Sequence, residues 1–448
     1  MLVMKFGGTS LGDRKRIETA LSLVKGRLSR RPILVCSAHA GVTDLLLAGA
    51  RAAAAGKPDL SPIADREHEV LRELKLPASL VADDLKRLSD IFQGLSLLRE
   101  LTPRSLDHVA AFGERMCVKA IAALLRRRRI PATAVQADEA GLVTDGKFTR
   151  ASVLPEAYEA LAKSLARVKG VPVVTGFVGR DREGNVTTLG RSGSDYTATI
   201  VGRAVGAEEV EIWKDVDGVL TADPRIVPHA RPVEHMTYAE ASELAYYGAK
   251  VIHPATIHPA LERGIPVRIL NTFDPTAPGT LILPGKPAGA AVVTSIASKR
   301  GIRLVNIVSA RMLGQSGFMA SVFETFRRHD VVIDLIATSE ISVTVSVDRP
   351  DGLEAAVSDL RAVAQVEVEG PNALVAVVGE GLGEAVGLAG KVFGALGGAN
   401  VNVRAVSYGA TKTNLQVVVA EADANRSVAA LHAALFPDPE GRGGGRRS

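Results

Sequence analysis

Residues 187–198 combine the side chains and the backbone that a phosphate-handling site needs. A β-branched run leads into a loop of Gly and Ser that carries Arg191, and Asp195 follows where a helical pattern begins. Loop amides and a helix N-terminus favour negative charge. The arginine offers a rigid donor fork for a carboxylate or phosphate, and the aspartate can hold a neighbouring cation. This loop is the first candidate site.

A second candidate loop follows the apolar residues 2–6. Lys5 precedes Gly7 and Gly8, and a helical pattern opened by Asp13 comes next, so the loop lies at a predicted strand-to-helix corner. In a Walker A loop the lysine follows the glycines, so this is not a P-loop, and the protein-kinase motifs are absent as well. Read alone, the glycine pair is a tight turn. Together with the loop around Asp195, it favours nucleotide binding.

Six apolar segments alternate with helical patterns and are predicted to form strands. They cover residues 2–6, 32–36, 132–136, 171–177, 210–213 and 266–269. This alternation is typical of an α/β fold with an open, mainly parallel sheet covered on both faces. Residues 57–105 instead show consecutive helical patterns, so we expect a helical excursion there. We assign residues 1–275 to this first domain.

A segment rich in Pro and Gly, residues 274–287, predicts a domain boundary. An internal repeat follows, in which residues 317–323 match residues 387–393, 70 positions later. Each copy predicts a strand, a glycine turn, a helix and two further strands. We therefore predict two α+β domains at 290–370 and 371–436, with a strand from about 292–308 as a candidate to complete the second. Residues 437–448 lack an apolar period and are predicted to be disordered.

Composition and charge exclude several classes of protein. A chain of 448 residues predicts more than one domain. Its two cysteines, Cys36 and Cys117, lie in apolar surroundings, which favours core positions in a reducing cytoplasm. The net charge of +5 arises largely from residues 126–129, which end a helical pattern beginning near Ser105, and from the tail. Cations at a helix end are favourable, and no nucleic-acid-binding pattern or bilayer-spanning run is present. We expect neither nucleic acid nor membrane as a partner.

Six motifs occur in one order along the chain and carry a family resemblance. They are KFGGTS at 5–10, SAHAGVT at 37–43, FGE at 112–114, GRSGSDYTA at 190–198, WKDVDGVLTADPR at 213–225 and GAKVIHP at 248–254. These motifs resemble those of the aspartate kinases, within the amino-acid kinase superfamily. The repeated C-terminal third resembles a tandem pair of ACT domains, which are modules that bind amino acids. The resemblance implies an amino-acid kinase fold followed by two ACT domains.

The reaction that this resemblance implies is transfer of the ATP γ-phosphate to the side-chain carboxylate of L-aspartate. The products are 4-phospho-L-aspartate and ADP, in the first step toward lysine, threonine and methionine. A carboxylate is already ionised at neutral pH, so the reaction needs no general base. The obstacle is repulsion between two anions. We expect catalysis by positioning and positive charge, with Mg²⁺ bridging the phosphates of ATP and no metal site in the protein itself.

The resemblance also implies roles for single residues. Lys5 and Gly8 would meet the phosphates, and Asp195 would orient Lys5. Arg191 would bind the α-carboxylate of aspartate through its donor fork, and Glu114 would pair with the α-ammonium. Further substrate-binding residues are Ser37, Thr43 and Ser194, and further nucleotide-binding residues are Gly7, Lys214, Asp215, Asp223, Arg225 and Lys250.

Three positions depart from the family pattern. Ser192 stands where the family usually has glycine, and Lys214 and Leu220 stand where other members often carry a small polar residue and a tyrosine. Ser192 can fit only if its φ is not positive or if the strain is tolerated. We expect modest changes in affinity, with activity retained.

The first C-terminal repeat resembles lysine-inhibited aspartate kinases at two places. Asp334 could hold an ammonium, and the loop amides of residues 317–319 could bind a carboxylate. Read singly, Met312 and Phe318 would be core residues. The effector-binding residues that the resemblance implies are Met312, Gly317, Phe318, Met319, Asp334, Thr338, Ser339 and Glu340. Lysine is the expected inhibitor, with threonine as the alternative, and pairing of ACT sheet edges predicts a homodimer or homotetramer.

Two other functions are compatible with parts of the chain. Another kinase acting on a carboxylate, such as an acetylglutamate or glutamate kinase, would share the loops, but the block at 213–225 and the tandem repeat argue against it. An amino-acid sensor with an inactive kinase domain would share the C-terminal third. The presence of Lys5, Arg191, Asp195 and Lys250 argues against inactivity.

Overall fold

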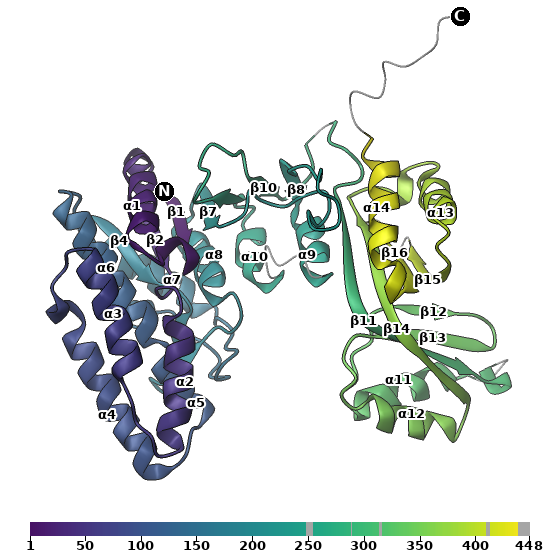
Figure 1. Cartoon of the computed structure of the whole chain (residues 1–448), viewed down its shortest axis with the longest axis horizontal. Helices are drawn as coiled ribbons and strands as arrows, with labels where there is room; N and C mark the ends of the chain where they lie inside the picture. Colours follow the sequence, from purple (N-terminus) through teal and green to yellow (C-terminus); the bar gives the residue numbers. More distant parts are fainter. Residues whose placement is uncertain (248–253, 288, 313–315, 409–412, 438–448) are drawn as a thin grey trace, which may run out of the picture. The chain divides into compact units, whose positions relative to one another are not determined.

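The computed structural model describes residues 1–247, 254–287, 289–312, 316–408 and 413–437. These residues form two compact units (Figure 1). The first unit contains the described residues of 1–219, 234–238 and 251–285, and the second contains those of 220–233, 239–250 and 286–448. Some predicted residues lie outside the described ranges. They are Lys250, residues 313–315 of the loop between Met312 and Gly317, and residues 438–448 of the tail that is predicted to be disordered.

The first unit is built on a sheet of eight strands in the order β3-β4-β2-β1-β7-β9-β10-β8. The strands are β1 (Leu2–Phe6), β2 (Pro32–Cys36), β3 (Ala132–Val135), β4 (Val171–Thr175), β7 (Glu209–Lys214), β8 (His235–Thr237), β9 (Val267–Asn271) and β10 (Thr280–Leu283). Neighbours from β3 to β9 are parallel, whereas β10 is antiparallel to β9. The predicted open, mainly parallel sheet is therefore confirmed. The short strands β8 and β10 at one edge were not predicted.

Helices and a hairpin complete the first unit. They are α1 (Arg14–Lys25), α2 (Val42–Ala54), α3 (Ser61–Glu73), α4 (Ala82–Leu98), α5 (Pro103–Ala110), α6 (Phe112–Arg127), α7 (Glu156–Ala166), α8 (Gly193–Val205), α10 (Pro254–Leu261), β5 (Val178–Arg180) and β6 (Val186–Thr188). The pattern from Ser105 to the arginine run is two helices, because α5 ends before Ala111 and α6 begins after it. Every helix in the described ranges is too short or too polar to cross a bilayer.

The predicted helical excursion forms a bundle with its own apolar core. Helices α3 and α4 run beside α2, which also contacts α5 (Figure 1). Leu46 of α2, Ile63 of α3 and Phe92 of α4 are fully buried in one cluster. Gly49 permits this packing, because a Cβ there would lie 2.8 Å from the Phe92 ring.

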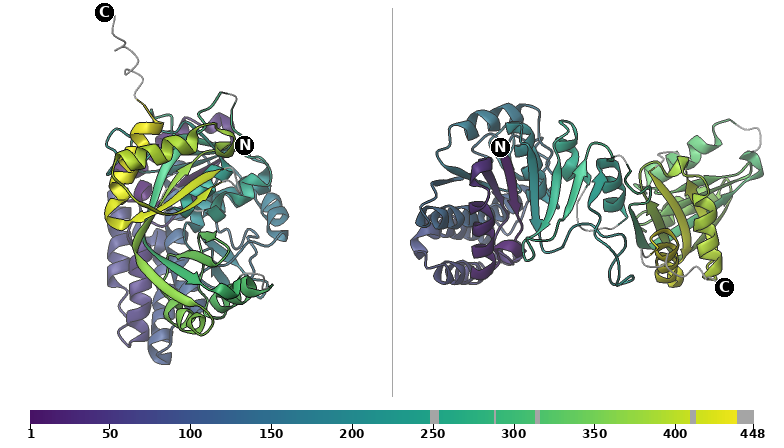
Figure 2. Two further views of the ribbon diagram at one scale, coloured as in Figure 1. Left: turned by 90° about the vertical axis from the view of Figure 1, so that its right-hand side faces the viewer. Right: turned by 90° about the horizontal axis from the view of Figure 1, so that it is seen from above.

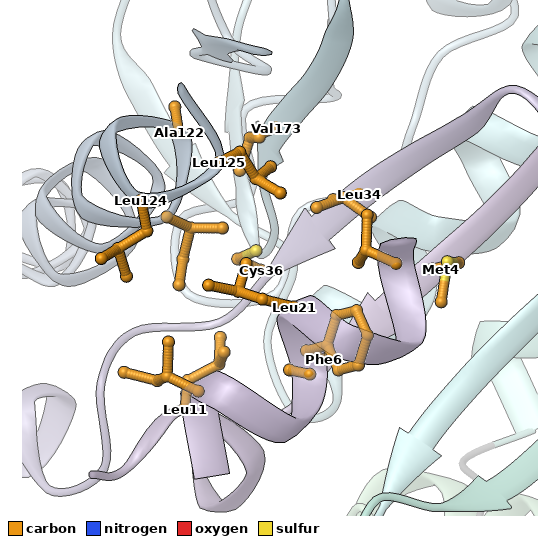
Figure 3. Close-up of a cluster of buried hydrophobic side chains, with 14 of the residues drawn as sticks. Met4, Phe6, Leu11, Leu21, Leu34, Cys36, Ala122, Leu124, Leu125 and Val173 are labelled. Atoms are coloured by element: carbon orange, nitrogen blue, oxygen red, sulfur yellow. The ribbon is translucent and has the colours of Figure 1, made fainter. Parts of the chain in front are cut away.

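A second apolar cluster lies between the sheet and helices α1 and α6. Figure 3 shows part of it, with Phe6, Leu34 and Cys36 from the sheet and Leu21 and Leu125 from the helices. Cys36 and Cys117 are both buried free thiols, as predicted, and burial raises the pKa of Cys36 to about 12. Trp213 on β7 stacks on Phe6, with ring centroids 6.1 Å apart. This core fixes the strands whose ends carry the candidate site.

The second unit contains one antiparallel sheet of six strands in the order β12-β13-β11-β14-β16-β15. The elements are β11 (Ser295–Val308), β12 (Ile336–Thr338), β13 (Ser342–Val347), β14 (Gln365–Val378), β15 (Val403–Tyr408), β16 (Asn414–Ala420), α9 (Tyr238–Tyr246), of which residues 239–246 belong to this unit, α11 (Phe318–Arg328), α12 (Leu353–Arg361), α13 (Leu388–Gly398) and α14 (Ala424–Leu435). The long strands β11 and β14 run side by side through both repeats (Figure 2). The boundary expected between residues 370 and 371 falls inside β14, so the two repeats share a sheet.

Two segments that precede residue 275 belong to the second unit rather than the first. Ala222 and Val227 are buried in the apolar core of the second repeat, and the Thr221 hydroxyl lies 2.9 Å from Nε2 of His432. On α9, the carboxylate of Glu240 accepts hydrogen bonds from Lys286 and Thr294. The two units are therefore interleaved in sequence, which a single boundary near residue 275 does not describe.

Candidate active site

The candidate site lies at the carboxyl ends of β1 and β2. Strand β1 lies between β2 and β7, so the strand order changes direction there. In open parallel sheets, ligands bind at such switch points, outside the carboxyl ends of the strands. Residues 7–12 (the phosphate loop) follow β1, and residues 37–43 (the substrate loop) follow β2 and enter α2.

Two ammonium groups share one buried carboxylate at this edge. Nζ of Lys5 lies 2.6 Å from Oδ1 of Asp195, and Nζ of Lys214 lies 2.9 Å from Oδ2. Asp195 is in the first turn of α8, and its side chain is 3% exposed. Burial alone would raise the pKa of Asp195, but Lys5 and Lys214 outweigh it and hold that pKa below its usual value. The cluster therefore carries a net positive charge beside the phosphate loop.

Glu114 contributes a buried carboxyl group to the same site. Its Oε1 accepts a hydrogen bond of 3.1 Å from the amide of Ala38 in the substrate loop. Its Oε2 has no hydrogen-bond partner among the described residues. Burial raises the pKa of Glu114 to about 8, although the Ala38 hydrogen bond and the charge of Lys5 oppose the shift. An incoming cation would supply the missing partner.

A pocket of ≈ 410 Å³ joins these groups. Seven of the predicted site residues line it, namely Lys5, Gly8, Ser37, Thr43, Glu114, Ser194 and Asp195. The structure thus brings together residues from the first, second, third and fourth motifs. It also adds His39 and Phe177 to the lining, neither of which was assigned a role from the sequence.

Phe177 shows what sequence reasoning missed. It follows β4 with a φ of 66°, which is unusual for a bulky residue, and its amide donates to the Thr197 hydroxyl on α8. Strained backbone of this kind occurs preferentially at functional sites. The one available signal was the position of Phe177 at the end of a predicted strand, beside Gly176.

Other predicted residues lie beside the pocket rather than in its lining. A Cβ at Gly7 would lie 3.3 Å from Nζ of Lys5, so this glycine leaves room for the ammonium. The exposed Arg191 stands between Gly190 and Ser192, which line the pocket. Asp215 is exposed in the loop after β7. Their ligand roles stay predictions.

The remaining predicted nucleotide residues are not among those that line this pocket. Asp223 and Arg225 belong to the second unit, where they pair with each other at 2.6 Å and the arginine side chain is 87% exposed. Lys250 is outside the described residues. The nucleotide roles of all three rest on the resemblance and stay predictions.

Ser192 adopts the left-handed conformation, with a φ of 58° directly before α8. For a residue with a Cβ this costs ~1–2 kcal/mol, whereas glycine pays only its greater chain entropy of ~0.5–1 kcal/mol. We expect Ser192→Gly to stabilise the first unit by about 0.5–1 kcal/mol. Urea unfolding followed by fluorescence of Trp213, the single tryptophan, measures this. An equal or lower unfolding midpoint would show that the serine relieves its own strain.

The predicted effector residues lie in the first repeat of the second unit. Phe318 is 8% exposed and belongs to the apolar core, while Met312 and Met319 pack against that core. Gly317, with a φ of 90°, precedes α11. Thr338, Ser339 and Glu340 are exposed where β12 turns toward β13. Phe318 lies in the apolar core and Met312 packs against it, as their residue types alone predict. Their effector roles stay predictions.

Asp334 is the most distinctive of the effector residues. Its side chain is 3% exposed, and Oδ2 lies 4.0 Å from Nζ of Lys299, which also pairs with Asp348 at 2.6 Å. Burial and the nearby charge of Asp348 raise the pKa of Asp334 to about 7. Two carboxylates thus share the Lys299 ammonium, and the charge of Arg349 opposes the rise of the Asp334 pKa.

Comparison with known proteins agrees with this architecture. Residues 1–271 match the amino acid kinase family, and residues 305–362 and 375–435 match an ACT domain. The chain is 38% identical to Aspartokinase 3, chloroplastic, of Arabidopsis thaliana, over 97% of this chain and 81% of that protein.

Solved structures of E. coli aspartokinase III resemble the whole chain. The structure in complex with aspartate and ADP (R-state) matches with a TM-score of 0.81 and 34% identity, covering 97% of this chain and all of that one. The complex with lysine and aspartate (T-state) matches with a TM-score of 0.79 at the same identity, covering 97% and 99%. The fold is that of an amino acid kinase joined to ACT domains. Within that class, the chain belongs to the aspartokinase family.

Proposed function

We propose that this protein is an aspartate kinase, which transfers the γ-phosphate of ATP to the side-chain carboxylate of L-aspartate. The observation that carries the proposal is the charge pattern of one pocket. Lys5 lines the pocket and shares Asp195 with Lys214, and Glu114 lines it with a carboxyl oxygen that has no hydrogen-bond partner among the described residues. An anionic phosphate matches the ammonium groups, and the ammonium of an amino acid matches the Glu114 carboxyl group.

The mechanism follows from charge and position. The attacking carboxylate is ionised at neutral pH, so Asp195 has no proton to remove and acts instead by holding Lys5 in place. The Lys5 ammonium and the Gly8 amide stabilise the charge that develops on the transferring phosphoryl group. Mg²⁺ enters as part of the MgATP substrate, since it is usually bound by substrate phosphates with few protein ligands.

The choice of acceptor group follows from how the amino acid is oriented. With its α-ammonium on Glu114 and its α-carboxylate on Arg191, aspartate directs its side-chain carboxylate toward Lys5. The Ser37, Thr43 and Ser194 hydroxyls supply neutral hydrogen bonds around it. A longer acid such as glutamate would place its carboxylate too far along the same path.

The decisive experiment is ADP release measured with L-aspartate, L-glutamate and N-acetyl-L-glutamate side by side. Hydroxylamine in the reaction traps an acyl phosphate as a hydroxamate, which distinguishes carboxylate phosphorylation from simple ATP hydrolysis. We expect hydroxamate with L-aspartate alone. Preference for either other acid would indicate another carboxylate kinase, and no turnover with any acid would favour the amino-acid sensor.

Replacing Arg191 tests the α-carboxylate contact. Arg191→Lys keeps the charge but loses the bidentate fork, so the KM for aspartate should rise about tenfold while the KM for ATP is unchanged. Arg167→Lys, an exposed substitution in the same unit, serves as the control. An increase confined to the KM for ATP would assign Arg191 to the phosphates.

We also propose that lysine inhibits the enzyme by binding the first ACT domain, with its side-chain ammonium on Asp334. Solved E. coli aspartokinase III is found with lysine in its T-state, which supports the choice of effector. Inhibition requires lysine to bind the less active state better, typically by ~1–3 kcal/mol.

Sheet edges at β12 and β15 would join ACT domains into a homodimer or homotetramer. The buried free thiols support a cytoplasmic location.

Lysine inhibition should depend on pH through Asp334. Its pKa of about 7 means that the carboxyl group is neutral below that pH and ionised above it, so lysine should inhibit more strongly as pH rises through 7. Asp334→Asn should weaken inhibition and remove this dependence, with uninhibited activity retained. Lysine titrations at about pH 6 and about pH 8 measure the strength of inhibition, and the exposed substitution Asp351→Asn serves as the control. Equal sensitivity of wild type and Asp334→Asn would exclude this pocket.

A further inference from the structure

His39 is the one long side chain in the turn from β2 into α2, and it is fully buried. Its neighbours in that turn are Ala38, Ala40 and Gly41, whose side chains are too small to anchor a loop. Nδ1 of His39 lies 3.1 Å from each carboxylate oxygen of Glu67 on α3, and both side chains are 0% exposed. The imidazole therefore ties the substrate loop to the helical excursion.

The position of His39 along the chain determines what this tie controls. On one side, the amide of Ala38 donates the hydrogen bond to Glu114. On the other, the His39 carbonyl accepts a hydrogen bond of 3.1 Å from the amide of Val42, the first residue of α2. A shift of His39 would therefore move both the partner of Glu114 and the helix end that presents Thr43 to the pocket.

Helix α3 also holds the phosphate loop, through the residue before Glu67. The Arg66 guanidinium donates a hydrogen bond of 2.6 Å to the Gly12 carbonyl. The two loops touch, because a Cβ at Gly8 would lie 3.1 Å from the carbonyl oxygen of Ala38. Consecutive residues of one helix thus brace two adjoining loops of the site.

The contact between His39 and Glu67 is poorly suited to stability alone. Nε2 of His39 is buried and, within the described ranges, has no hydrogen-bond partner. A buried polar atom without a partner is destabilising, and apolar residues of similar volume often replace a buried polar pair without loss of stability. A hydrogen bond between two buried groups does fix direction, which apolar contacts do not.

We propose that Glu67 and His39 form a positioning pair, which holds the substrate loop so that Ala38 orients Glu114 toward the α-ammonium of the amino acid. The inference rests on the proposed function and deepens it. Neither residue is assigned a contact with substrate. Their effect reaches the aspartate subsite through the Ala38 amide.

The test compares two replacements of the histidine. His39→Leu fills a similar volume without a hydrogen bond, whereas His39→Asn keeps a donor near the position of Nδ1. His68→Gln, an exposed substitution on the same helix, is the control. For each protein we would measure the KM for aspartate, the KM for ATP, kcat, and the urea midpoint from Trp213 fluorescence.

His39→Leu should raise the KM for aspartate about tenfold, with the KM for ATP and kcat within about twofold of wild type and no loss of unfolding midpoint. His39→Asn should restore most of the aspartate affinity, which a purely structural role would not predict. If His39→Leu does not fold, Glu67→Gln takes its place, and it should raise the KM for aspartate at least about threefold.

Two results would overturn the positioning pair alone. One is a KM for aspartate that stays at the wild-type value in His39→Leu and Glu67→Gln. The other is an equal increase in both KM values with a lowered unfolding midpoint, which would mark the pair as structural. Turnover of the wild-type protein is measured first. If it shows no turnover that depends on aspartate, the proposed function and this inference are both overturned.

Discussion

Lys5→Ala should reduce kcat by about 10²–10³-fold while the Kd for aspartate stays nearly unchanged. The ammonium of Lys5 is held 2.6 Å from Asp195 in a largely buried site, so it is fixed before the reaction begins. A pre-positioned charge that meets a developing anion contributes ~3–4 kcal/mol to the transition state, which corresponds to this loss in rate. Because Lys5 acts on the phosphoryl group, the loss should appear in kcat rather than in aspartate binding.

The Lys5 measurement combines turnover with a direct binding titration of aspartate. Asp195 keeps Lys214 as a partner at 2.9 Å, so the variant does not leave an unpaired buried charge. Lys25→Ala, at an exposed position in the same unit, should behave as wild type. Near-normal turnover of folded Lys5→Ala, judged by Trp213 fluorescence, would remove Lys5 from the mechanism.

Glu114→Gln should raise the KM for aspartate by about 10–100-fold and abolish its dependence on pH. A hydrogen bond to a charged group contributes ~1.5–3 kcal/mol, and the variant loses the charge that pairs with the α-ammonium. With a pKa of about 8, Glu114 is protonated at neutral pH in the free enzyme and must release a proton when aspartate binds. In the wild type, the KM for aspartate should therefore fall as pH rises through 8, until the ammonium of the substrate itself titrates.

A stability measurement provides the control for Glu114. Its pKa in the folded protein is raised, so the folded state binds the proton more tightly than the unfolded chain. Stability should consequently decline as pH rises from the ordinary glutamate pKa through 8 in the wild type, and the Gln variant should lack this contribution. Exposed Glu139→Gln should leave both profiles unchanged. A flat KM profile in the wild type would contradict the assignment of Glu114 to the ammonium.

The interleaving of the two units bears on regulation. Residues 220–233 and the described part of 239–250 come from the sequence matched by the amino acid kinase family, yet they pack within the unit that contains the ACT domains. Ala222 and Glu240 show how, since the first is buried in the core of the second repeat and the second accepts hydrogen bonds from Lys286 and Thr294. Segments of the kinase sequence thus depend directly on the packing of the regulatory unit.

Much of the fold could be predicted because its signals are local. Each predicted strand of the first unit was found within two residues of its expected bounds, since an apolar run between glycine turns and helical patterns specifies a buried parallel strand. Lys5 and Asp195 were identified for the same reason, each at a strand-to-helix corner with Gly-rich neighbours. Lys5 ends a strand of the main sheet, whereas Asp195 follows the separate β5-β6 hairpin, and the packing of α8 against β1 brings these residues, 190 positions apart, into an ion pair.

The sequence by itself thus determined the family, the strands, and the loops that meet at the site, because these depend on neighbours along the chain. Only the tertiary structure decided the rest. The pKa of Glu114 arises from burial beneath a loop distant in sequence, and the contact of His39 with Glu67 joins a turn to a helix that no motif linked to it. The left-handed Ser192 and the transfer of residues 220–233 to the second unit likewise follow from three-dimensional packing. Burial, charge and backbone strain are set by atoms that meet only when the chain has folded.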